Sequence, residues 1–182
     1  MGQASRNRIP PVAGLPIGMT LAIGSMPHRD SDLALDRILD ACPEAPCWPQ
    51  LPTLGFQENM MAQFSEGIPC IRIDWKKNRS FFARPESCPE ELTQFYENCQ
   101  EAEKTGNLSP FALSKSYAKG LHSFLERFSR PPGASLAFVK GQVTGPLTFG
   151  LSIMDETGLP ALFDETLVDV VRKGILMKAL WQ

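Results

Sequence analysis

The sequence predicts an α/β fold, specifically a partial (βα)8 TIM barrel that contains about the first four strand–helix units. Short apolar stretches alternate with amphipathic helical stretches, which indicates βαβ units and a parallel sheet. The clearest apolar stretch, 134–144 (ASLAFVKGQVT), begins almost continuously apolar, as parallel strands covered on both faces do. The chain has 182 residues, whereas a complete barrel needs about 250, so the barrel is expected to be unfinished.

Four strands and five helices are expected along the chain. The strands cover 20–25, 46–53, 69–75 and 134–144. The second is expected to be irregular because its prolines cannot donate to a ladder. The helices are expected to begin near Ser31, Gln57, Ser87, Ser109 and Pro160.

The predicted helix boundaries follow from residue type. Ser31 can cap the first helix, Ser87 and Glu90 form the pattern of a capping box, and Gly106 can end that third helix. The last helix still has its apolar spacing at Leu180 and Trp181. Residues 1–182 are therefore expected to be the N-terminal half of one barrel domain, truncated at its C-terminus.

Composition excludes several classes of protein. A net charge of -2 and 43% hydrophobic residues describe a globular chain without the electrostatic footprint of a nucleic-acid or membrane-surface protein. No apolar run reaches the roughly 20 residues that a membrane span needs, and no signal peptide is evident, so a cytoplasmic location is expected. The five cysteines are odd in number and lack CxxC spacing, which favours reduced, buried thiols.

Candidate site residues lie just after the expected strands, where parallel α/β folds bind their ligands. Gly24 and Ser25 can let a ligand approach the backbone and can hold a carboxylate, or they form an ordinary tight turn. His28 is a candidate acid, base or ligand group, although a surface or capping histidine is the simpler interpretation. Gln142 and Thr144 lie at a strand end between glycines, before Pro146.

Acidic and amide side chains supply the remaining candidates. Glu58 could hold a substrate ammonium and Asn59 could hydrogen-bond a polar group, or both simply occupy the first turn of a helix. Asp74 ends an expected buried strand, where a charge needs a partner; that partner could be Arg72 or Arg84 instead of a ligand.

Three stretches together resemble motifs of cobalamin-independent methionine synthases. Residues 22–28 (AIGSMPH) are similar to their first-strand motif, and 55–64 (GFQENMMAQF) to their second-strand region. Residues 140–149 (KGQVTGPLTF) are similar to the motif in which a Thr-Gly-Pro closes the fourth strand. The uroporphyrinogen decarboxylases, of the same barrel superfamily, have a related glycine-proline turn.

The resemblance implies a zinc-dependent methyltransferase that moves a methyl group from a folate to the thiol of homocysteine or a similar small thiol. Ile23, Gly24 and Ser25 match residues that hold the homocysteine backbone in that family. The family's zinc ligands lie in the C-terminal half, so the zinc ligands are expected beyond Gln182 and the fragment alone is expected to be inactive. Expected partners are a small-molecule thiol and a methyl donor, with no nucleic acid and no membrane.

Departures from the family keep other functions open. Phe56 stands where the synthases carry a glutamate, with Glu58 further on, and Met26 and His28 replace the usual Phe and Gln. A divergent branch with another thiol or methyl donor would fit these changes. A decarboxylase of the uroporphyrinogen type is one alternative, although its arginine-rich N-terminal motif is not matched. A non-catalytic, degenerate half-barrel is another.

Overall fold

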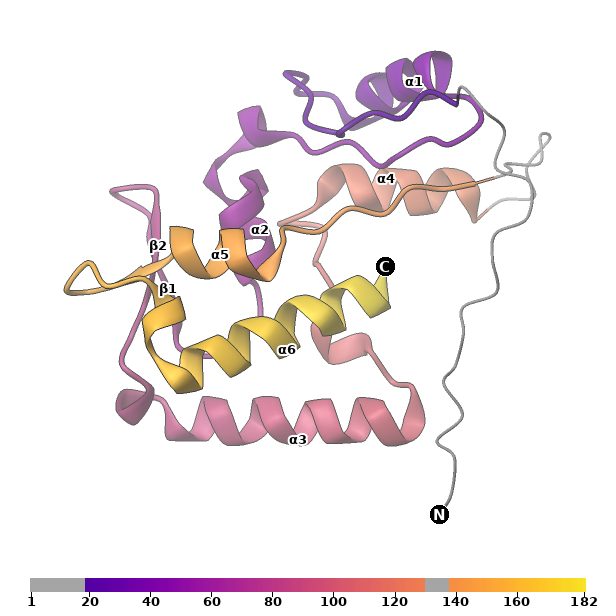
Figure 1. Cartoon of the computed structure of the whole chain (residues 1–182). Coiled ribbons are helices and arrows are strands. Elements are labelled where there is room, and N and C mark those ends of the chain that lie inside the picture. The colour runs from indigo at the N-terminus through magenta and orange to yellow at the C-terminus, as the bar shows by residue number, and fades with distance from the viewer. Residues whose placement is uncertain (1–18, 130–137) are drawn as a thin grey trace.

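A computed structural model describes residues 19–129 and 138–182 and shows a mixed α/β fold (Figure 1). The described part contains a small three-stranded sheet and six α-helices. The helices are α1 (Ser31–Ala41), α2 (Met60–Ser65), α3 (Pro89–Thr105), α4 (Lys119–Phe128), α5 (Pro146–Ser152) and α6 (Glu165–Trp181). The strands are β1 (Ile71–Asp74), β2 (Arg79–Phe82) and β3 (Met154–Asp155).

The sheet is built around a hairpin. β1 pairs antiparallel with β2, with Ile71 opposite Phe82, and β2 pairs in parallel with β3. Asn78 adopts a left-handed φ of 48° in the turn, which lets the chain reverse directly. The expectation that 69–75 forms a parallel strand followed by a helix is therefore wrong, because that strand pairs with the segment that immediately follows it.

The other three expected strands lie side by side as extended segments joined by single parallel bridges. Ser25 pairs with Gln50, and Cys47 pairs with Lys140. Backbone hydrogen bonds accompany the bridges: Gln50 N donates to Gly24 O at 2.8 Å, and Lys140 N donates to Pro46 O at 2.9 Å. Residues 134–137 of the fourth expected strand lie outside the described residues. This parallel arrangement brings the ends of three sequence-distant segments together.

Several helix boundaries differ from the expected ones. Asp30, not Ser31, caps α1 through its side chain, and the expected capping box at Ser87 is absent because Ser87 Oγ donates to Arg84 O. The helix expected from Ser109 is instead a single 3-10 turn, Ser109–Phe111, with α4 starting only at Lys119. Gly106 ends α3 with φ 75°, in the left-handed conformation that its sequence position predicts.

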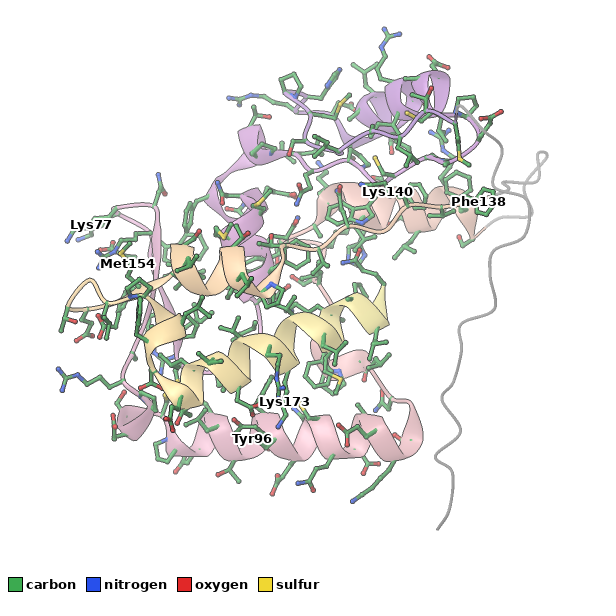
Figure 2. All side chains as sticks on the ribbon, viewed as in Figure 1. Lys77, Tyr96, Phe138, Lys140, Met154 and Lys173 are labelled. Atoms are coloured by element: carbon green, nitrogen blue, oxygen red, sulfur yellow. A yellow bond between two sulfur atoms is a disulfide. The ribbon has the colours of Figure 1, made fainter. Side chains whose placement is uncertain are left out.

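The longer helices α3 and α6 are joined by polar contacts among Tyr96, Asp169 and Lys173, which we call the polar clamp (Figure 2). Tyr96 on α3 donates its hydroxyl to Asp169 on α6 at 3.0 Å, and Lys173 pairs with Asp169 at 2.9 Å while lying over the Tyr96 ring. Burial, together with the neighbouring carboxylate of Asp169, raises the pKa of Tyr96 to about 12. The tyrosine therefore keeps its proton, and the clamp stays intact, at neutral pH.

A disulfide joins Cys70, just before β1, to Cys88, just before α3. The expectation that all five thiols are reduced is wrong for this pair. Cys42, Cys47 and Cys99 are free and buried. None of the helices in the described ranges is long and apolar enough to cross a membrane.

Candidate functional site

A cavity of about 440 Å³ opens where the three parallel segments end. Its size falls within the usual range for small-molecule sites. Its lining comes from each of the three motif regions and from the segment between the first two. The lining residues are Ile23, Gln50, Met60, Phe64, Lys140, Gly141, Gln142, Val143 and Thr144.

Gly24 lies directly beneath the side-chain amide of Gln142. Its φ of 109° is one that other residues rarely adopt, and a Cβ at this position would stand 2.4 Å from Gln142 Oε1. Gln142 Nε2 donates to Trp48 O at 3.0 Å, which fixes the amide in place. Gln142 Oε1 is buried and accepts no hydrogen bond within the described chain. The glycine thus allows an amide to lie over the first motif with a free acceptor.

A chain of hydrogen bonds runs inward from Ser25. The Ser25 hydroxyl donates to Gln50 Oε1 at 3.3 Å, Gln50 Nε2 donates to Gln63 Oε1 at 2.7 Å, and Gln63 Nε2 donates to Tyr117 O at 2.7 Å. Gln50 and Gln63 are both buried. Because each amide has two fixed partners, this side of the site is held in one orientation.

Lys140 and Thr144 provide the donors of the cavity. Figure 2 shows Lys140 on the extended segment that leads from Phe138 into α5. Lys140 makes no ion pair with any residue of the described ranges. Thr144 is only 6% exposed, and its Oγ1 has no hydrogen-bond partner among the described residues. A buried hydroxyl without a partner is costly, so this group is available to a ligand.

Glu58 is buried but does not line this cavity. It is 2% exposed; its Oε1 accepts from Lys119 N at 2.9 Å, and its Oε2 is without a partner in the described structure. Burial raises the pKa of this carboxyl, and the backbone N–H of Lys119 opposes that rise. The structure thus ties Glu58 to the start of α4, where it accepts a hydrogen bond from the N–H of the first helical residue.

The remaining predicted site residues lie apart from the cavity lining. Asn59 caps α2 by accepting from Met61 N at 3.0 Å. Asp74 accepts from Lys76 N and Lys77 N in the hairpin turn, at 3.0 and 3.1 Å, and does not pair with Arg72, which binds Glu91. His28 Nδ1 is buried without a partner in the described part, while His28 O accepts from Thr53.

The structure adds two residues that strand-end reasoning did not select. Gln50 lies within the proline-broken second segment, and Lys140 stands at the start of the KGQVTGPLTF stretch. The importance of Lys140 could have been predicted from the sequence, because Lys140 is the one charged residue of the expected strand 134–144. That of Gln50 could not, since its role depends on the bridge that pairs it with Ser25.

The resemblance places the zinc ligands beyond Gln182, and the described residues add no candidate metal site of their own. They contain no group of three or more His, Cys, Asp or Glu side chains close enough to hold a metal. Burial also raises the pKa of the Cys47 and Cys99 thiols, whereas zinc ligation requires thiolates.

No family model, curated protein or solved structure matches this chain.

Proposed function

We propose that this chain forms the substrate-binding part of an enzyme that transfers a methyl group to homocysteine or a similar small thiol. The proposal also takes the parallel segments to be the first part of a TIM barrel. One observation carries it: the three stretches that resemble methionine synthase motifs, far apart in sequence, all contribute to a single cavity. Ile23 comes from the first, Met60 and Phe64 from the second, and 140–144 from the third.

The described residues bind and orient a substrate in this proposal. Gln142 and Thr144 offer hydrogen-bonding groups in the lining of the cavity. Ile23, Met60 and Phe64 offer apolar surface that suits the methylene and sulfur part of an amino acid. Because the described residues contain no metal-binding group, their proposed part in the reaction is to bind and orient the substrate.

Binding of L-methionine, the product of the proposed reaction, tests the function on the full chain. Methionine needs no added reductant, so the Cys70–Cys88 disulfide remains intact during the measurement. We expect titration calorimetry to detect binding, and Ser25→Ala to weaken it about three- to tenfold, because the Ser25 hydroxyl holds the amide of Gln50 in the cavity lining.

Ser129→Ala is the matched control, because Ser129 is exposed at the end of α4 and its hydroxyl donates to Glu126 O. A chain that binds neither methionine nor homocysteine, or a Ser25→Ala variant as tight as Ser129→Ala, would contradict the proposal. Release of carbon dioxide from uroporphyrinogen would favour the decarboxylase alternative instead.

A further inference from the structure

The cavity between the three parallel segments is asymmetric in charge. Lys140 is the single charged residue of its lining, and none of the described lining residues is acidic. The walls around it are largely apolar, with Ile23, Met60, Phe64 and Val143. Ile23, Met60 and Val143 are exposed, so the cavity is open to an entering ligand, and Lys140 is the charged group that such a ligand meets.

Nothing in the described structure neutralises Lys140. The residue that pairs with it across the parallel bridge is Cys47. Burial raises the pKa of the Cys47 thiol despite the nearby charge of Lys140, so at neutral pH Cys47 provides no thiolate to pair with the lysine. The ammonium is therefore left for a ligand.

Thr144 supplies an independent observation at the same place. Its side chain is more than nine-tenths buried, lines the cavity, and has a hydroxyl without a partner in the described residues. A hydroxyl can donate to a carboxylate oxygen, and an anionic acceptor makes such a bond stronger than a neutral one does. Thr144 and Lys140 are four residues apart on one extended segment, and both line the cavity.

The backbone of the first motif is less suited to hold an anion. Met26 N, the first N–H after the Gly-Ser pair, already donates to Gln50 O at 2.9 Å. The Ser25 hydroxyl donates to Gln50 Oε1. Two groups that the turn could have offered to a carboxylate are thus in use.

We infer that Lys140 and Thr144 form a carboxylate site, which binds the anionic end of a small ligand whose apolar part lies against Ile23, Met60 and Phe64. The inference deepens the proposed function, on which it rests for the sulfur-containing part of the ligand. It makes Lys140 the residue that determines the charge class of the substrate.

The test compares three probes on the full chain by titration calorimetry: methionine lacking its amino group, methionine lacking its carboxylate, and hexanoate. We expect both carboxylates to bind and the amine to bind at least about tenfold more weakly, because only the carboxylates bond to Lys140. Binding of the carboxylates should weaken as salt concentration rises.

Variants locate the site. Lys140→Met should weaken carboxylate binding at least about tenfold, and Lys140→Arg should retain most of it. Thr144→Val should weaken it about three- to tenfold. Lys77→Met is the matched control, since it removes a lysine charge from the hairpin turn, away from Lys140 in Figure 2. Circular dichroism melts verify that each variant is folded.

The outcomes separate the inference from the proposed function. Equal binding of carboxylate and amine, or a folded Lys140→Met variant as tight as Lys77→Met, would overturn the inference. Hexanoate could bind through Lys140 as tightly as methionine lacking its amino group, and methionine itself could bind no more tightly than hexanoate. That result would support the carboxylate site and would contradict the proposed thiol function.

Discussion

Lys178 carries an ammonium group into the interior between α6 and the 3-10 turn Ser109–Phe111. It is 1% exposed, and its Nζ has only a long contact of 3.5 Å to Phe111 O. Burial lowers the pKa of Lys178 from 10.5 to about 8, although Glu66 opposes the shift. The unfolded chain therefore holds this proton more tightly than the folded chain does.

Stability should depend on pH because of Lys178. Between pH 8 and pH 10.5 the unfolded state binds the proton and the folded state does not, so stability rises with pH across this interval. At pH 7 Lys178→Met should be more stable than the parent by about 3 kcal/mol, since it removes a buried charge and keeps the volume. Urea unfolding at pH 7 and above pH 10 measures this. A parent as stable as the variant at both values would contradict it.

Single positions were predictable from sequence only where local rules govern them. Gly106, Pro146 and Gly24 stand where a turn or helix end requires their backbone, and the structure uses them there. Lys178 falls on the buried stripe of α6, but lysine is usually exposed, so the sequence does not reveal its burial.

The disulfide connects two elements that the chain separates by 18 residues, the start of β1 and the residue that caps α3. Such a crosslink restricts the unfolded chain, and for a loop of this length its removal should lower stability by about 3 kcal/mol. We expect Cys88→Ser to reduce the melting temperature by several degrees. Cys42→Ser is the control, because Cys42 is buried but free. Rapid alkylation of Cys70 and Cys88 without reductant would show that the link does not form.

The elements were predicted unevenly, for a physical reason. α3 is long and amphipathic, so its position and its end at Gly106 follow from local periodicity. The hairpin of β1 and β2 was missed because Ile71–Asp74, which alternates apolar and charged residues, shows a strand but not which segment that strand pairs with. Only the turn around Asn78 identifies that segment.

Several large apolar side chains of the whole molecule face solvent. Leu147 and Leu151 lie one helical turn apart on α5, and Leu176 and Leu180 lie one turn apart on α6. Leu147 is 70% exposed. Contiguous apolar surface is uncommon on monomeric proteins. We therefore expect the chain to associate in solution.

Light scattering after size-exclusion chromatography measures this association. A Leu147→Glu, Leu151→Glu double variant should shift the chain toward monomer, whereas Leu33→Glu on α1 should not. A parent that is monomeric and melts cooperatively would contradict the expectation. The mixed α/β class is confirmed by the structure, while the completion of a barrel stays a prediction, since three single-bridge segments are all that the described chain provides.

The direction of the hydrogen bonds that begin at Ser25 is determined by their last acceptor. Tyr117 O can only accept, so Gln63 must donate to it and must accept from Gln50, and Gln50 must in turn accept a hydrogen bond from Ser25. Gln142 Oε1, which has no partner among the described residues, adds a free acceptor to the cavity lining. A molecule whose carboxylate lies at Lys140 is complementary to this acceptor when it also carries an N–H donor, as a zwitterionic amino acid does.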